Sequence, residues 1–177
     1  MRTMIVVTSA LALSACATPV TPRYSVGTDN VLALRNLNAT GIYVGEFGEP
    51  AKDDVKCRGI GRMRLQDDLT HAQFIRKALT DELKVAGSYA PSPARVTITG
   101  QLIDIDSSSG LGDGHWSMTL ALRSTNGASM TVSNTYKFRA GMAATAACDN
   151  VAQAFVPAVQ DVIGKAVASP QFAALIR

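Results

Sequence analysis

The order of apolar and polar side chains predicts a long helix in the first half of the chain. Between Thr70 and Ala86 the apolar residues recur three and four positions apart, which is the spacing of one helix face. They are Phe74, Ile75, Ala78, Leu79, Leu83 and Ala86. Thr70 is a suitable N-cap, and Gly87 fits the left-handed conformation that commonly follows a last helical turn. We therefore expect an amphipathic helix over residues 70–86.

Two strands are predicted on either side of this helix. Residues 41–47 form an apolar run that ends in turn-forming residues, which is typical of a short strand. Residues 95–105 first alternate between apolar and polar, as a half-buried strand does. The alternation fails near Gly100–Ile103, so we expect a β-bulge or burial on both faces there.

A hairpin is predicted in the second half of the chain. Residues 115–124 alternate regularly, and residues 130–138 form the return strand. Thr125-Asn126-Gly127 lies between them, and Asn-Gly suits a tight turn that needs positive φ. Asn134 falls on the apolar face of the return strand, so its side chain should be paired or lie near an edge.

Two further helices complete the predicted order. A long apolar stripe runs from Val151 to Ala166, and we expect Asp149 or Asn150 to cap that helix. A short helix is expected near residues 29–37. The resulting fold class is α+β, a two-layer α/β sandwich in which a mainly antiparallel sheet of about four strands is covered by two helices.

Composition agrees with one globular domain. The 177 residues are 47% hydrophobic and 18% charged, so wholesale disorder is excluded. A formal net charge of +3 is too small to indicate a nucleic-acid partner. The sequence also contains no motif for a cofactor or a metal ion, and we expect neither.

The first residues have the character of an export signal. Arg2 supplies a positive charge, and residues 5–13 form an apolar stretch far shorter than a membrane-spanning helix. Leu13-Ser14-Ala15-Cys16 follows, and it resembles the lipobox of bacterial envelope lipoproteins. This resemblance implies cleavage before Cys16 and acylation of Cys16. In the enterobacterial sorting pattern an Asp directly after the lipidated cysteine retains a lipoprotein at the inner membrane. Ala17 stands at that position here, so the resemblance implies the periplasmic face of the outer membrane.

The expected organisation follows from this signal. Residues 1–15 are expected to be the lipoprotein signal peptide. Residues 16–30 contain Pro19 and Pro22, which favour extended backbone, and we expect them to be a flexible lipid-anchored tether. Residues 31–177 are expected to form a single periplasmic domain.

Two cysteines remain once Cys16 is assigned to lipid. Cys57 and Cys148 can form only one pair, and the periplasm is an oxidising compartment. We therefore predict a Cys57–Cys148 disulfide, and the alternative is two unrelated buried thiols.

The predicted domain also resembles a group of small envelope lipoproteins. The order of elements and the stretch from Phe74 to Gly87 are similar to the lipopolysaccharide-assembly lipoprotein, the YajG-like lipoproteins and the amino-terminal domain of TolB. The resemblance covers most of residues 40–168 by topology. It implies the fold and the compartment, and no functional side chain is shared at a fixed position.

Few residues are of a type and spacing that indicate a binding or catalytic site. Lys56, Arg58, Arg62 and Arg64 form a basic run that could meet an anionic lipid or glycan, or could be a solvated loop balanced by nearby Asp residues. His71 and His115 lack a nucleophile motif around them.

The glycine-rich stretch Gly110–Gly114 lacks the lysine and the following helix of a phosphate loop, so we expect a turn between strands.

The expected function is a non-enzymatic binding, assembly or transport-auxiliary role in the cell envelope. Its partners would be the membrane, through the N-terminal lipid, and an envelope protein, lipid or glycan. The alternative is a lipid-anchored periplasmic hydrolase whose site is assembled from scattered residues. An exposed sheet edge or apolar patch would favour the first, and a pocket holding a histidine beside Ser and Asp would favour the second.

Overall fold

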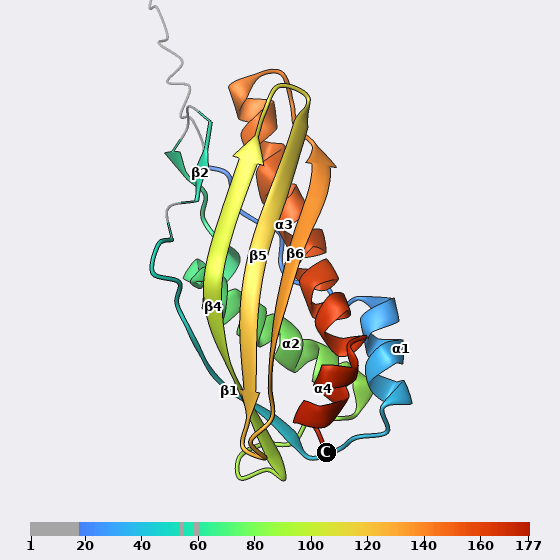
Figure 1. Ribbon diagram of the computed structural model, residues 1–177. Coiled ribbons are helices and arrows are strands. Elements are labelled where there is room, and N and C mark those ends of the chain that lie inside the picture. Colours follow the sequence, from blue (N-terminus) through green and yellow to red (C-terminus); the bar gives the residue numbers. More distant parts are fainter. Residues whose placement is uncertain (1–17, 54, 59–60) are drawn as a thin grey trace, which may run out of the picture.

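A computed structural model describes residues 18–53, 55–58 and 61–177 of the chain (Figure 1). The elements follow in the order α1 (Thr28–Asn36), β1 (Ile42–Gly48), β2 (Lys56–Cys57), β3 (Gly61–Arg62), the 3-10 turn η1 (Gln66–Asp68), α2 (His71–Ala86), β4 (Val96–Ser109), β5 (Asp113–Ser124), β6 (Ser129–Arg139), α3 (Ala144–Val167) and α4 (Pro170–Leu175). The signal peptide and the lipobox with Cys16 lie outside the described residues.

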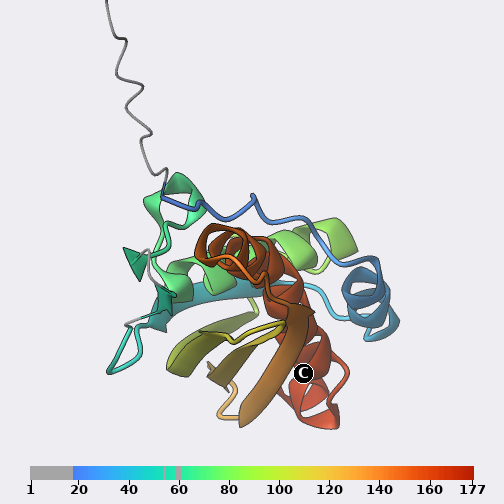
Figure 2. The same cartoon turned by 90° about the horizontal axis from the view of Figure 1, so that it is seen from above.

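The main sheet has the strand order β1-β4-β5-β6. β1 is parallel to β4 and is connected to it through α2, whereas β4, β5 and β6 are antiparallel neighbours. The helices lie together on one face of this sheet (Figures 1 and 2). The predicted two-layer α+β fold with a mainly antiparallel four-stranded sheet is therefore confirmed.

The core forms between the sheet and α2 and α3. The alternation predicted along β5 buries four side chains against the helices, and each is at most 2% exposed: Trp116, Met118, Leu120 and Leu122. Trp116 packs on Phe155 of α3 with ring centroids 4.9 Å apart, and its indole N–H donates to the carbonyl of Val151 at 3.0 Å. The register of β4 against β5 shifts between Leu102 and Asp104, which confirms the predicted bulge.

The predicted ends of α2 are confirmed. The Thr70 hydroxyl accepts from the backbone N–H of Gln73, and the Gln73 side chain accepts from the backbone of Thr70, so the two residues form a capping box. Gly87 follows the last turn with φ of 82°. An L side chain is strained at this angle, which explains why glycine ends the helix.

The predicted start of α3 is wrong. The helix begins at Ala144, after Ala143 as N-cap, so Asp149 and Asn150 lie inside it. Residues 143–147 are rich in alanine, which has the highest helix propensity, and the extra turn buries Ala147 and Cys148. Tertiary burial therefore extends the helix past residues that would otherwise be good caps.

The described part of the predicted tether packs on the domain. Residues 19–27, which we call the strap, cross the outer face of the helix layer towards α1 (Figure 2). The backbone carbonyl of Arg64 accepts from the N–H of Thr21, and the backbone N–H of Arg64 donates to the carbonyl of Pro19, each at 3.0 Å. Thr21 is buried, and the strap leads directly into α1. The expectation of a flexible tether over residues 16–30 is corrected for this segment, because its backbone pairs with Arg64 and the side chain of Thr21 is buried.

Candidate functional site

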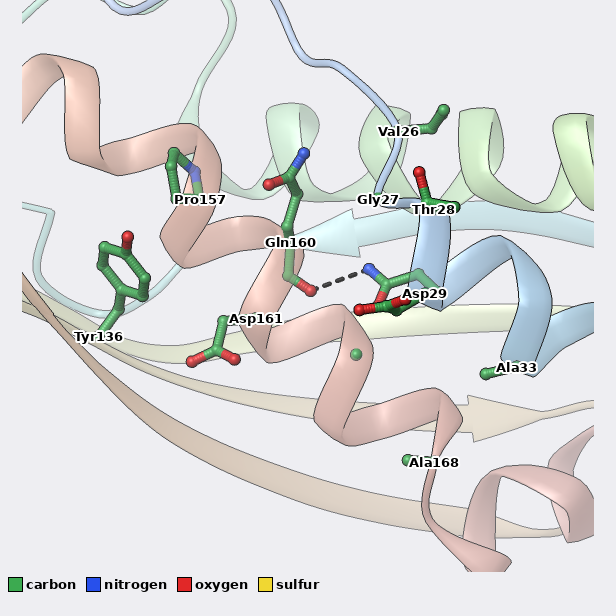
Figure 3. A pocket seen from close by; sticks show the side chains of 12 residues that line it. Val26, Gly27, Thr28, Asp29, Ala33, Tyr136, Pro157, Gln160, Asp161 and Ala168 are labelled. Carbon is green, nitrogen blue, oxygen red and sulfur yellow. Dashed lines mark hydrogen bonds between the residues drawn. The ribbon is translucent and has the colours of Figure 1, made fainter.

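A groove with a volume of about 800 Å³ lies between α1 and α3 (Figure 3). Figure 3 shows the start of α1 on one side of α3 and Tyr136 of β6 on the other. The residues around the groove come from four separate elements: Val26, Gly27, Thr28, Asp29, Asn30, Ala33, Tyr136, Pro157, Gln160, Asp161, Gly164 and Ala168.

A buried cluster around Glu82 fixes one wall of this groove. Glu82 of α2 is fully buried, and its Oε1 accepts from the hydroxyl of Tyr24 at 2.6 Å and from the N–H of Gly27 at 2.8 Å. Its third donor is Nδ2 of Asn30, at 3.3 Å. Burial and the hydrogen bond to Glu82 raise the pKa of Tyr24 far above its ordinary value, so this phenol stays protonated. The cluster joins the strap, α1 and α2.

α1 also approaches α3 closely. Nδ2 of Asn30 donates to the carbonyl of Gln160 at 2.9 Å, as the dashed line in Figure 3 shows. A Cβ placed on Gly164 would lie 2.7 Å from Oδ1 of Asn30. Glycine at position 164 therefore allows the two helices to meet at the base of the groove.

The groove is acidic. Asp29 lies in the first turn of α1, and Asp161 lies on the exposed side of α3. Asp161 accepts from Nδ2 of Asn134 at 2.7 Å, which confirms that Asn134 is paired. Among the described residues, no lysine or arginine lines this groove. A cationic ligand would therefore meet two carboxylates here without a competing positive charge.

The outer edge of β6 runs beside this groove. The N–H of Ser124 donates to the carbonyl of Ala128, and this bond sets which pairs of β5 and β6 are hydrogen-bonded. Because bonded pairs alternate in an antiparallel ladder, the backbone groups that point away from β5 belong to every second residue of β6. They are those of Ser129, Thr131, Ser133, Thr135, Lys137 and Arg139. Within the described part of the chain, these groups have no hydrogen-bond partner, and β6 is an open strand edge.

The predicted disulfide between Cys57 and Cys148 is confirmed. The two Cα atoms lie 5.1 Å apart, and both side chains are buried. The bond connects β2 to α3 across 91 positions of sequence. It holds the loop before α2 against the helix layer.

The four basic candidates do not form one cationic site. Arg58 donates to the carbonyls of Gly141 and Met142, at 3.2 and 2.8 Å, and Arg64 pairs with Asp68. Arg62 and Arg64 border a small cavity of about 260 Å³, whose lining includes Asp53 and Asp68; the lining does not include Lys56 or Arg58. Acids therefore balance the basic side chains at this cavity, as expected of a solvated loop.

His71 is buried and packs against the aromatic core. Its Nδ1 lies 2.8 Å from a carboxylate oxygen of Asp53, and its ring packs edge-on against Phe155 at 5.4 Å. Its other nitrogen, Nε2, is buried and has no hydrogen-bond partner among the described residues. In this conformation the buried Nε2 does not face solvent, and Nδ1 is paired with Asp53.

A second group lies on the open face of the sheet. Nε2 of His115 is 3.8 Å from a carboxylate oxygen of Asp106, and Ser117 lies two positions along the same strand. His115 and Ser117 border a cavity of about 570 Å³ that also includes Lys137. Sequence reasoning missed this group because its members come from three strands, although the two-residue alternation already places His115 and Ser117 on one face.

The described residues give no further indication of a ligand or a membrane span. Within residues 18–53, 55–58 and 61–177, no three of His, Cys, Asp and Glu are grouped so that they could hold a metal ion. No helix in the same part of the chain is long and apolar enough to cross a bilayer. No protein-family model matches the sequence, and the search of curated proteins found no match.

Proposed function

We propose that this protein is a lipid-anchored, non-enzymatic binding component of the bacterial envelope. Acylated Cys16 would hold the domain at the periplasmic face of the outer membrane, as the lipobox Leu13-Ser14-Ala15-Cys16 implies. The confirmed disulfide supports this proposal, because disulfides persist in oxidising compartments such as the periplasm.

The binding surface that we propose is the open edge of β6 together with the groove between α1 and α3. The observation that carries this proposal is the row of β6 backbone groups that have no partner among the described residues, beside the groove between α1 and α3. An extended polypeptide segment can pair with such an edge through its own backbone, while its side chains enter neighbouring pockets. The partner is therefore an envelope protein that presents an extended segment.

The charge of the groove indicates which side chains the bound segment carries. Asp29 and Asp161 face a groove that no described lysine or arginine lines. A lysine or arginine in the segment would gain from these carboxylates, so we expect the bound segment to carry positive charge.

The lipid anchor has a direct test. Cys16→Ser is expected to abolish incorporation of labelled palmitate and to move the protein from the membrane fraction to the soluble fraction, because the thiol that accepts the lipid is absent. Labelling of cells followed by fractionation measures both. Cys57→Ser is a control that leaves the lipobox intact, and palmitate incorporation that persists in the Cys16→Ser protein would refute the anchor.

The binding surface is tested by in-cell photo-cross-linking. A photoreactive residue at Ser133, on the β6 edge, is expected to capture one envelope protein, whereas the same residue at the exposed Lys84 of α2 should not. Asp29→Asn together with Asp161→Asn is expected to reduce the capture at Ser133. Equal capture from both positions, or capture that the two Asn changes leave unaltered, would contradict this surface.

A second candidate function is ester or amide hydrolysis on the open sheet face. The observation that favours it is that Asp106 lies near His115, and that His115 and Ser117 border one cavity. A fluorophosphonate probe would label Ser117 if His115 activates it, and Ser117→Ala would then remove the label. Because the His115–Asp106 distance of 3.8 Å exceeds a hydrogen bond, we expect no labelling of the wild-type protein.

A further inference from the structure

Two neighbouring loops at one end of the molecule expose large apolar side chains. Leu111 lies in the turn between β4 and β5 and is 76% exposed, and Met142 lies between β6 and α3 and is 75% exposed. We call residues 107–112 and 140–146 the tip. Neither stretch contains a charged residue, so the tip differs from the mixed charge around it.

The two loops form one surface. The N–H of Ala140 donates to the carbonyl of Gly112 at 3.0 Å, which joins the return from β6 to the β4–β5 turn. Arg58 donates to the carbonyls of Gly141 and Met142 and so holds the second loop from the other side. Figure 1 shows the β4–β5 turn and the start of α3 together at the upper end of the molecule.

The tip also contains the positive end of a helix dipole. α3 begins there, and its N-cap Ala143 supplies no side-chain hydrogen bond to the first helical N–H groups. The first turn contains no acidic residue that would neutralise the positive end of the helix dipole. With the guanidinium of Arg58 beside it, this end of a 24-residue helix is suited to phosphate oxygens.

The described chain begins at the same end of the molecule. Pro19 pairs with Arg64, and the neighbouring β3 pairs with β2, from which Cys57 and Arg58 reach α3 and the tip. Figure 1 shows the start of the described chain close to β2. Cys16 precedes Pro19 by three residues, which span at most about 11 Å of extended chain.

From these observations we propose that the tip lies in the interface of the membrane to which Cys16 anchors the protein. Leu111 and Met142 enter the boundary between headgroups and acyl chains, while the start of α3 and Arg58 face lipid phosphates. This inference rests on the proposed lipid anchor and adds an orientation to it. The β6 edge and the acidic groove then run away from the membrane along the side of the domain, where a partner can reach them.

Quenching by brominated lipids tests this orientation. Lipidated protein carrying Leu111→Trp is reconstituted in vesicles of phosphatidylethanolamine and phosphatidylglycerol, with and without bromine on the upper acyl chain. We expect bromine to reduce the added tryptophan emission about twofold, because the side chain lies at the headgroup boundary. Wild-type protein supplies the background, since Trp116 is its single tryptophan and is buried.

Leu32→Trp is the matched control. Leu32 is an apolar residue of α1 that is 50% exposed, and α1 lies far from the tip in Figure 1, so its emission should not respond to bromine. Equal quenching at positions 111 and 32, or no quenching at either, would overturn the orientation. The mass of the N-terminal peptide reports acylation separately. If the protein is acylated but its emission is not quenched, only the orientation is refuted. If the protein is not acylated, the anchor is refuted. Quenching of Leu111→Trp emission by added brominated vesicles then still tests whether the tip contacts lipid.

Discussion

Replacing both Cys57 and Cys148 by alanine is expected to lower the free energy of unfolding by about 4 kcal/mol. The bond closes a loop whose ends are 91 positions apart, and a cross-link of that length removes much of the entropy of the unfolded chain. Both sulfur atoms are buried between β2 and α3, and alanine leaves no polar group there without a partner. Urea unfolding followed by circular dichroism measures the change.

Reduced wild-type protein is the matched control for this prediction. Under excess dithiothreitol its side chains are unchanged in size, so it reports the loss of the cross-link without the small cavities that alanine leaves. We expect its stability to approach that of the double alanine protein. A double alanine protein that unfolds at the same urea concentration as the oxidised wild type would show that the bond contributes nothing to stability.

Much of the fold was predictable because local patterns and tertiary burial agree. Along β5 every second residue is apolar, and the same residues are buried beneath α2 and α3. Thr70, Gln73 and Gly87 mark the ends of α2 in the sequence and perform those roles in the structure. The disulfide was predictable from two cysteines and an inferred oxidising compartment, without knowledge of their positions.

The candidate site was not predictable because its contacts join distant segments. Glu82 has the spacing of a polar residue on an amphipathic helix, and nothing near it in sequence indicates burial. Its partners Tyr24 and Gly27 are 58 and 55 positions away, in a segment whose prolines indicate a tether. The open edge of β6 likewise depends on the order of strands in the sheet, which periodicity does not determine.

Removing the carboxylate of Glu82 is expected to be about as destabilising as losing the disulfide. Glu82→Ala leaves the hydroxyl of Tyr24, the N–H of Gly27 and the amide of Asn30 without their common acceptor. Because buried donors without a partner cost about 1–3 kcal/mol each, and the strap and α1 can relax towards water, we expect a loss of about 3–5 kcal/mol. Urea unfolding gives the free energy. Hydrogen exchange should show the strap and α1 losing protection before the sheet does.

Asp81→Ala is the control for Glu82, because it removes a carboxylate from the adjacent position of the same helix. Asp81 forms an ion pair with Lys77 one turn earlier, and pairs of this kind contribute about 0.3–0.5 kcal/mol. Tyr24→Phe separates the contacts further, since it removes one donor and keeps the packing of the ring on Phe74. Similar losses for Glu82→Ala and Asp81→Ala would mean that the Glu82 cluster does not hold the strap. A larger loss confined to Glu82, with exchange rising first in residues 19–36, would show that this one carboxylate fixes the wall of the groove.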